Sequence, residues 1–334
     1  MRVVAAPDKL RGTASARAVA SAVARAATNL GWECDEVPMA DGGEGTLDAL
    51  GGANRTSPVT GPLGAPVDAE WRLDGRTAVI EMARASGLEL IGGAEQNDPI
   101  AASTAGTGEL IAIALEAGAT RVIVGVGGSA TTDGGLAALR ALHPLGRLRG
   151  VELVVACDVR TLFLDAADVF APQKGATTAQ VGLLRRRLAR LAQVYEADHG
   201  IDVATLVGGG AAGGLAGGLA AVGARLVPGF DLVADELDLE DHVVGADLVI
   251  TAEGFLDAQS FEGKVVGGVA ALAERVGVPV VAIVGEVFDD VDERIAAISL
   301  VQRFGDARAR NDTVACIEEV AASVLSDQTV SEGP

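Results

Sequence analysis

The chain has 334 residues, of which 49% are apolar and 22% are charged, so it can bury a sizeable core and lacks the low hydrophobicity that keeps chains disordered. This length favours two domains over one. A formal net charge of −20 repels the phosphate groups of nucleic acids and of anionic lipids, which argues against nucleic acid or a membrane surface as a partner.

Cysteine usage and hydropathy indicate a cytoplasmic protein. Cys34, Cys157 and Cys316 form no CxxC pair, which is typical of proteins in a reducing compartment. The sequence has neither a signal-type apolar segment near its start nor a long uncharged apolar run, so we expect no membrane span.

Short runs of β-branched residues alternate with longer alanine-rich stretches, a pattern that predicts an α/β fold with a largely parallel sheet. At the start of the chain we expect a strand, a loop, a helix capped by Thr13 or Ser15, a second strand, a second loop and another helix. Their expected ranges are 3–6, 7–12, 13–31, 36–39, 40–45 and 46–50, in that order.

The pattern of residue types changes between about residues 53 and 82. There the turn-forming segment GPLGAP and runs of alternating apolar and polar residues predict an antiparallel meander. After it we expect a helix, a buried strand, a glycine-rich loop that leads into a helix, a further strand, and a helix rich in leucine and arginine. Their expected ranges are 108–117, 121–126, 127–142, 152–156 and 181–195, and a glycine-dense stretch follows at 208–218.

The last third of the chain returns to the alternating pattern. Strands are expected at 247–251, 280–284 and 298–301, and helices at 265–276 and 313–325. The strands of the last third need further strands to pair with, and we expect the strands of the N-terminal βαβ unit to pair with them. We therefore expect a doubly wound, Rossmann-like parallel-sheet domain formed by both chain ends, an inserted α/β domain, and a mobile tail. Their expected ranges are 1–52 with 225–325, 53–224, and 326–334.

Five glycine-rich loops follow expected strands or open expected helices, at 6–12, 40–46, 127–135, 208–214 and 251–257. In open α/β sheets this is where ligands bind. The loop at 127–135 also offers the hydroxyl groups of Ser129, Thr131 and Thr132, which suit a polyphosphate. A tight turn without a ligand is its structural alternative. No GxxxxGK[ST] motif is present, and no acidic residue ends a clear following strand as a nicotinamide site requires.

Four of these loops carry carboxylates, and the few lysines lie in similar surroundings. The carboxylates are Asp8, Asp41 with Glu44, Asp133, and Glu253 with Asp257. The only lysines, Lys9, Lys174 and Lys264, lie beside glycines in expected loops. Phosphoryl transfer needs acidic ligands for Mg²⁺, cations on the phosphates, and a group that accepts the hydroxyl proton. The three histidines show no metal-ligand spacing and no GxSxG motif occurs, which disfavours zinc chemistry and hydrolase triads.

Seven segments stand out along the chain: PMADGGEGT (38–46), GTGEL (106–110), GGSATTDGG (127–135), ACDV (156–159), FAPQKGAT (170–177), GGGAAGGL (208–215) and ADLVITAEGFLDAQSFEGK (246–264). In this order they resemble the type-1 glycerate kinase family, and the resemblance extends from about residue 6 to residue 285. The resemblance implies a kinase that uses ATP and Mg²⁺ to convert D-glycerate to 2-phosphoglycerate or 3-phosphoglycerate. It also implies two α/β domains with the site in the cleft.

The resemblance places catalytic residues at Asp41, Asp133, Lys174, Asp257 and Lys264. As a mechanism we expect the nucleotide phosphates along Gly127, Gly128, Ser129, Thr131 and Thr132, with Mg²⁺ held by Asp41, Asp133 and Asp257. The first loop, with Asp8, Lys9 and Arg11, is expected to bind the acceptor, whose carboxylate would meet Lys9 and Arg11. Asp41 is the expected acceptor of the hydroxyl proton.

Two loops depart from the family pattern. The first loop, usually close to APDSFKGS, has Lys9 in place of Ser and Arg11 in place of Lys, and the late loop, usually TGEGRLD, has Ala252 and Phe255. Loss of an Arg removes a bidentate partner for carboxylate or phosphate. Two alternatives therefore stay open: a non-catalytic or regulatory paralogue that binds a nucleotide or small acid, and a kinase for a different hydroxy acid or sugar acid. The oligomeric state is also open, with a homodimer as a candidate.

Overall fold

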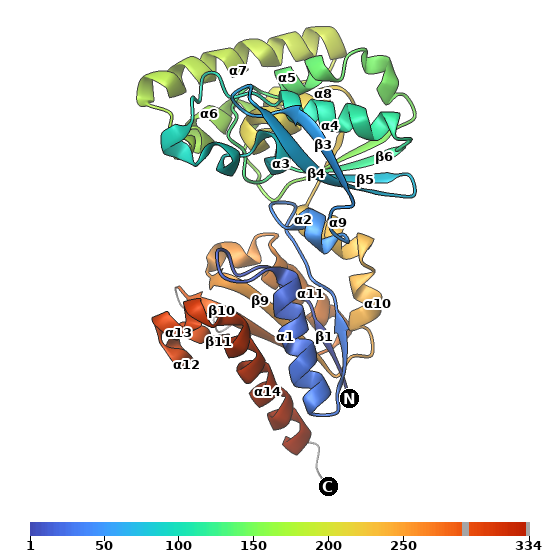
Figure 1. Cartoon of the computed structure of the whole chain (residues 1–334), viewed down its shortest axis with the longest axis vertical. Helices are drawn as coiled ribbons and strands as arrows, with labels where there is room; N and C mark the ends of the chain where they lie inside the picture. Colours follow the sequence, from blue (N-terminus) through green and yellow to red (C-terminus); the bar gives the residue numbers. More distant parts are fainter. Residues whose placement is uncertain (289–293, 332–334) are drawn as a thin grey trace. The chain divides into compact units, whose positions relative to one another are not determined.

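The computed structural model describes residues 1–288 and 294–331 of the chain. The chain divides into two compact units. Unit 1 consists of Met1–Asp41, Asp48–Leu50 and Gly229–Pro334, and unit 2 consists of Gly42–Leu47 and Gly51–Pro228. Both ends of the chain therefore belong to unit 1, as the blue and red segments of Figure 1 show.

Unit 1 is built on a five-stranded sheet in the order β11-β10-β9-β1-β2, and every neighbouring pair is parallel. Its strands are β1 (Arg2–Ala5), β2 (Glu33–Glu36), β9 (Leu248–Leu256), β10 (Val280–Val287) and β11 (Ala296–Ser299). From β1 the chain continues to β2 on one side, whereas from β9 it continues to β10 and β11 on the other. The strand order thus reverses between β1 and β9, which is the place where open α/β sheets bind ligands.

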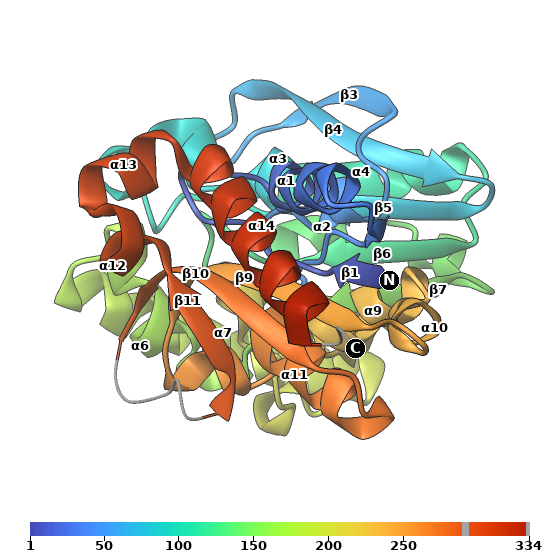
Figure 2. The same ribbon diagram turned by 90° about the horizontal axis from the view of Figure 1, so that it is seen from below.

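Helices cover both faces of this sheet. On one face α1 (Ala16–Asn29) and α14 (Thr313–Ser331) lie side by side and pack on Val3, Ala5 and Ile250 (Figures 1 and 2). On the other face α9 (Gly229–Glu236), α10 (Leu239–Val243) and α11 (Val265–Val276) pack on Val4 and Val249. Ser15 caps α1, since its side chain accepts a hydrogen bond from the Ala18 amide. The shorter helices are η8 (Ala258–Phe261), α12 (Leu300–Phe304) and α13 (Asp306–Asn311).

Unit 2 contains a mixed six-stranded sheet in the order β3-β4-β5-β6-β7-β8. Strands β3, β4 and β5 are antiparallel, as the sequence predicts, whereas β5 to β8 are parallel. The strands are β3 (Arg55–Thr60), β4 (Pro66–Asp74), β5 (Thr77–Glu81), β6 (Arg121–Gly125), β7 (Glu152–Ala156) and β8 (Arg225–Val227). The chain is therefore of the α/β class with parallel pairing dominant in both sheets, which confirms the expected fold class.

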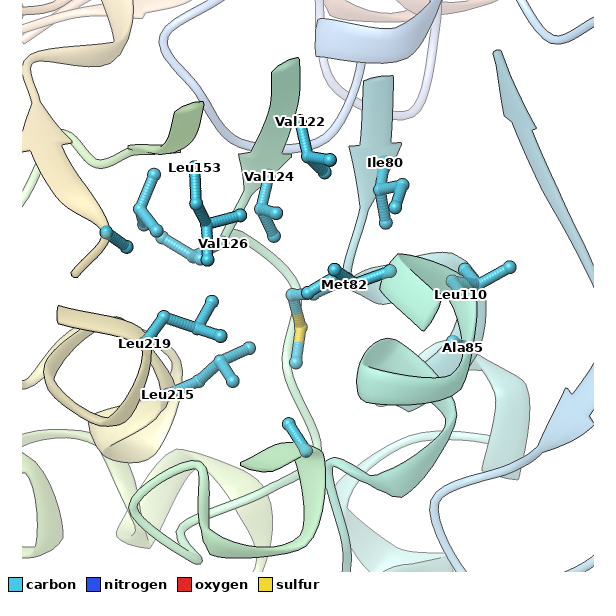
Figure 3. Packing of buried hydrophobic residues seen from close by; sticks show 14 of the residues in the cluster. Ile80, Met82, Ala85, Leu110, Val122, Val124, Val126, Leu153, Leu215 and Leu219 are labelled. Atoms are coloured by element: carbon cyan, nitrogen blue, oxygen red, sulfur yellow. The ribbon is translucent and has the colours of Figure 1, made fainter. Parts of the chain in front are cut away.

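The core of unit 2 lies between the sheet and three helices. Side chains of β5 and β6, such as Ile80 and Val124, meet Leu110 of α4 (Ala105–Glu116) and Leu215 of α8 (Leu215–Ala221), as Figure 3 shows. Between these helices lies α5 (Leu136–Ala141). A separate cluster around Phe163 is formed by α6 (Ala166–Phe170) and α7 (Thr178–His199). The remaining helices are α2 (Thr46–Ala49), α3 (Ala83–Ser86), η1 (Glu89–Ile91), η2 (Ala94–Gln96), η3 (Leu145–Leu148), η4 (Phe163–Asp165), η5 (Pro172–Lys174), η6 (Val203–Thr205) and η7 (Ala211–Gly214).

Much of the glycine content of unit 2 serves close contact between backbones. A Cβ atom on Gly108 would lie 2.3 Å from the carbonyl oxygen of Ala138, and one on Gly127 would lie 2.6 Å from the Cα atom of Gly43. Such distances are far inside van der Waals contact, so only glycine fits at either position. The glycine-rich loops therefore pack against other segments of the same unit.

Several elements differ from the sequence-based expectation, among them β11, which lies at 296–299 and not at the expected 298–301. Strand β9 runs to Leu256 through the expected loop at 251–257, because β10 continues beside it and pairs Glu253 with Val284. Strand β2 occupies residues 33–36, earlier than the expected 36–39. Helix α14 continues past Ser326, where a tail was expected, because Val324 and Leu325 are buried; residues 332–334 lie outside the described part. No helix among the described residues is both long enough and apolar enough to cross a membrane.

Candidate active site

In unit 1 the carboxyl ends of β1 and β9 bring two acidic residues side by side. Asp8 follows β1, and its backbone amide donates to the carbonyl oxygen of Ala252 in β9 at 2.8 Å. Glu253 is the next residue of that strand. The hydroxyl of Thr251 donates to the Ala6 carbonyl oxygen at 2.9 Å, which adds a further link between the two strands. The parallel pairing of β1 with β9 thus fixes both carboxyl groups at the switch point of the sheet.

Both of these carboxyl groups hold a proton more tightly than usual. Burial raises the pKa of Asp8 to about 7, against the opposing effect of Lys9, whose Nζ atom lies 4.0 Å from its Oδ1. Burial likewise raises the pKa of Glu253 to about 7, and a hydrogen bond from Ser260 and the charge of Lys264 oppose this shift. The Oε1 atom of Glu253 is buried and has no hydrogen-bond partner in the described chain. A cation placed here would favour the ionised form of both groups.

Three more predicted residues belong to the same cluster of unit 1. The charge of Lys264 lowers the pKa of both Asp8 and Glu253, while Asp41 raises that of Asp8 and Asp257 raises that of Glu253. Lys264 occupies the N-cap position of α11, and Asp257 caps η8 by accepting from the Ser260 amide at 3.1 Å. The cluster therefore combines four carboxyl groups with two lysines, Lys9 and Lys264.

Arg11 lies at the edge of a small cavity in unit 1. This cavity, of about 30 Å³, is also lined by Gly254, Phe255 and Arg310. The Arg11 side chain makes no hydrogen bond or ion pair within the described part of the chain. Phe255 is 46% exposed and packs against the equally exposed Phe288 in a tilted arrangement, with ring centroids 5.5 Å apart. The Arg11 guanidinium group, which has no partner among the described residues, and an exposed aromatic pair thus lie near the ends of β9 and β10.

Unit 2 holds a buried lysine in a polar setting. Lys174 ends η5 and is only 3% exposed, and its Nζ atom donates to the Ser129 hydroxyl and to the Thr131 carbonyl oxygen, each at 2.7 Å. Burial lowers the pKa of Lys174 to about 7, and the charge of Asp133 opposes that shift. An ammonium group has three N–H donors, so one remains for a ligand.

The neighbouring glycine-rich segment carries several unpaired polar groups. The hydroxyl oxygens of Thr131 and Thr132 are buried without a partner in the described chain. Within that part of the chain, the amides of Gly127 and Gly128 also donate to no acceptor. Hydroxyl and amide donors beside a lysine form an environment that suits an oxyanion.

Both carboxylate oxygens of Asp133 accept hydrogen bonds from residues of unit 2. Its Oδ2 atom accepts from the amide and the hydroxyl of Thr104, at 3.0 and 2.8 Å, and its Oδ1 atom accepts from the Gly135 amide at 3.0 Å. These bonds fix the start of α4 and the turn into α5. The three expected metal ligands are divided between the units, with Asp41 and Asp257 in unit 1 and Asp133 in unit 2.

Two polar residues of unit 2 were missed by the sequence-based reasoning. Glu81, 2% exposed at the end of β5, accepts from the amides of Gly45 and Leu47 at 2.8 Å each and so shapes the loop at 40–46. Asn97 donates from Nδ2 to the carbonyl oxygens of Ala130 and Lys174, at 3.0 and 2.8 Å. An acidic residue that ends the apolar run TAVIE is the one signal that could have drawn attention to Glu81.

Comparison with known proteins gives one consistent result. A model of the glycerate kinase family matches residues 3–145 and 143–328. The chain is 41% identical to the glycerate 2-kinase of Escherichia coli K12 in a match that covers 87% of each protein. It is 38% identical to the glycerate kinase of Halalkalibacterium halodurans in a match that covers 96% of this chain and 97% of that protein.

The fold agrees with a solved structure as well. A crystal structure assigned as glycerate kinase 2 from Salmonella typhimurium LT2 superposes with a TM-score of 0.82 at 36% sequence identity. The superposition covers 98% of this chain and 99% of that one.

Proposed function

The chain belongs to the glycerate kinase family, and from this premise we propose that it transfers the γ-phosphoryl group of ATP to a hydroxyl group of D-glycerate. The observation that carries the proposal within this chain is the surroundings of Lys174. A buried ammonium group with a spare N–H lies beside unpaired hydroxyl and amide donors. Preorganised donors of this kind stabilise the charge that develops on a transferring phosphoryl group.

We assign the nucleotide phosphates to the segment from Gly127 to Thr132. The amides of Gly127 and Gly128 and the hydroxyl groups of Ser129, Thr131 and Thr132 would donate to phosphate oxygens. Lys174 and Lys264 would offset negative charge on the phosphates. Their positive charge is needed because a net charge of −20 otherwise repels a triphosphate.

The acidic cluster of unit 1 fits a divalent cation that arrives with the nucleotide. No three acidic, histidine or cysteine side chains of the described chain form a metal site by themselves, but Mg²⁺ commonly binds one or two carboxylates together with phosphates and water. The unpartnered Oε1 atom of Glu253 beside Asp8 supports this fit. Asp41 and Asp257 would hold the ion with them, whereas the oxygens of Asp133 already accept hydrogen bonds. When bound, Mg²⁺ neutralises charge on the phosphates.

The acceptor acid is assigned to the loop after β1. The guanidinium group of Arg11 makes no hydrogen bond within the described chain and can receive the acceptor's carboxylate in bidentate fashion, with Lys9 beside it. Asp8 belongs to the same loop, and its carboxyl group would partly offset the positive charge of Lys9 and Arg11. Asp41 would accept the proton of the reacting hydroxyl group.

ATP and glycerate are both small anions, and we expect them to meet the enzyme in the cytoplasm.

An assay of the purified protein with ATP, Mg²⁺ and D-glycerate tests the proposal. We expect ADP to form only when glycerate is present, and phosphorus NMR of the product to identify 2-phosphoglycerate or 3-phosphoglycerate. Binding of nucleotide without turnover would instead support a regulatory paralogue and overturn the proposed activity.

A kinase for a different hydroxy acid or sugar acid remains the second candidate. The observation that favours it is Phe255, an exposed aromatic residue at the end of β9 where the family pattern has Arg. A panel of acceptors in the same assay decides between them, because the true acceptor has the highest kcat/KM.

A further inference from the structure

Asn97 joins two loops of unit 2 through a single amide group. Its Nδ2 atom donates one hydrogen bond to the carbonyl oxygen of Ala130, at 3.0 Å, and one to that of Lys174, at 2.8 Å. Both N–H groups of the amide are thereby used. Its Oδ1 atom is buried and accepts no hydrogen bond in the described part of the chain. The side chain therefore acts in this structure as a double donor between two backbones.

The residue that follows Lys174 also contacts the short segment from Ala94 to Asn97. Gly175 has φ +90°, and a Cβ atom there would lie 2.3 Å from the carbonyl oxygen of Ala94, the first residue of η2. The backbone of Gly175 thus lies directly against η2. Ala94 and Asn97 together hold the main chain at Lys174 and immediately after it.

The geometry links this support to the lysine ammonium group. Lys174 Nζ donates to the Ser129 hydroxyl and the Thr131 carbonyl oxygen, and Ala130, whose carbonyl Asn97 binds, lies between these two residues. One amide group thus sets the spacing between the backbone that carries the lysine and the backbone that receives its ammonium group. Among the hydrogen bonds of the described residues, the other link between Lys174 and the glycine-rich segment runs through the long lysine side chain.

We propose that Asn97 is a positioning residue, which holds the Lys174 ammonium group in place by tying the Lys174 main chain to the Ala130 main chain. The inference rests on the proposed function only in taking Lys174 to act on the phosphoryl group. An aspartate cannot replace Asn97, because an ionised carboxylate has no donor for either carbonyl oxygen.

The first test follows Lys174 directly and requires no enzymatic activity. Because the chain has only three lysines, a lysine-labelled sample gives three side-chain NMR signals, and Lys174→Met identifies the signal of Lys174. We expect that signal to titrate near pH 7 in the wild-type protein and at least one pH unit higher in Asn97→Ala. The reason is that a loosened lysine reaches water, which relieves the burial that lowers its pKa. An unchanged midpoint in Asn97→Ala would overturn the proposal.

The second test is a double-mutant cycle on the kinase reaction. We expect Asn97→Ala to lower kcat about 10- to 100-fold with a smaller change in KM for ATP, since small displacements of a catalytic group have effects of this size. In a Lys174→Met background the same substitution should change kcat less than twofold, because its effect passes through the lysine. Equal losses in both backgrounds would show a structural role only and contradict the inference.

Asn54 provides the matched control. It also makes two side-chain hydrogen bonds to backbone in unit 2, from Nδ2 to the Leu73 carbonyl oxygen and from the Leu73 amide to Oδ1, each at 2.9 Å, and neither bond involves a lysine. Asn54→Ala should leave both the lysine titration and kcat unchanged. If the wild-type protein shows no glycerate-dependent turnover, the proposed function fails while the titration still decides the role of Asn97.

Discussion

The ammonium group of Lys174 combines burial with a specific set of acceptors, which makes its contribution testable by single substitutions. We expect Lys174→Met to lower kcat about 10²- to 10³-fold, the usual loss when one charge-stabilising donor is removed. Lys174→Arg should not restore the rate, because the site is 3% exposed and shaped for a single nitrogen atom. Steady-state kinetics with circular dichroism as a fold control check both variants. A rate within threefold of wild type would remove Lys174 from the mechanism.

Asp41 tests the proton-accepting step. Asp41→Asn keeps the shape of the side chain but removes the carboxylate that would accept the hydroxyl proton. We expect turnover to fall by orders of magnitude while the Kd for ATP, measured by calorimetry, stays nearly unchanged. Lys264→Met serves as comparison, since it should weaken the interaction with the phosphates as well. Near-wild-type turnover of Asp41→Asn would exclude it as the base.

Sequence reasoning at the residue scale depends on whether a residue's partners are near it in the chain. Lysine is so rare here that Lys174 could be singled out from composition alone. Its burial could not, because Ser129 lies 45 positions away along the chain. Asn97 and Glu81 went unnoticed for the same reason: the carbonyl of Lys174 is 77 positions from Asn97, and the amide of Gly45 is 36 positions from Glu81. A residue whose role lies in distant contacts leaves no local pattern.

Among the structural elements, the glycine-dense stretch at 208–218 was expected as a ligand-binding loop, but in the structure its glycines serve the backbone conformation and close packing. Its residues form η7 and α8, where Ala212, Gly213 and Gly214 adopt left-handed backbone conformations and are buried. Alternating hydrophobic patterns predicted most strands and the longer α-helices, such as α1, α4 and α7, whereas short helices such as α3, α6 and α10 were not predicted. They failed at 251–257, since glycine in the sequence suggested a loop where pairing of β9 with β10 imposes a strand.

A pair of glycine substitutions separates close packing from backbone strain. A Cβ atom on Gly213 would lie 2.0 Å from the Thr131 carbonyl oxygen, whereas one on Gly200, at the end of α7, would meet nothing within 4 Å. Both residues have positive φ, +65° and +73°. We therefore expect Gly200→Ala to cost about 1 kcal/mol in strain and Gly213→Ala at least twice that. Thermal unfolding of both variants measures the difference, and equal Tm values would contradict the packing argument.

For the molecule as a whole, the buried ionisable groups predict an unusual dependence of stability on pH. Asp8 and Glu253 have pKa values raised to about 7, so the folded state binds more protons than the unfolded state between about pH 4 and 7. Their contribution to stability is therefore lost as the pH rises through that range. Lys174 has a pKa lowered to about 7, so its contribution increases from about pH 7 towards 10. The combined contribution of these three groups to stability is therefore lowest near neutral pH.

Chemical denaturation of the wild-type protein and of Glu253→Gln at several pH values tests this dependence. The variant cannot ionise at position 253, so the free energy of unfolding should fall less steeply between pH 4 and 7 than in the wild type. Because the chain has two units, the transition of each should be followed separately where they resolve. Parallel profiles for both proteins would show that Glu253 does not titrate in this range.

The sheet of unit 1 also determines when the protein can complete its folding during synthesis. Strand β1 pairs with β9, and the Thr251 hydroxyl reaches the Ala6 carbonyl oxygen across 245 residues. At roughly 5–20 residues per second, a ribosome needs about 12–50 s to supply that partner. During this time the nascent chain presents the apolar face of α1, including Val19 and Val23, while the sequence of unit 2 is already complete at Pro228. Chaperones that shield exposed apolar segments would find their substrate in the first 30 residues.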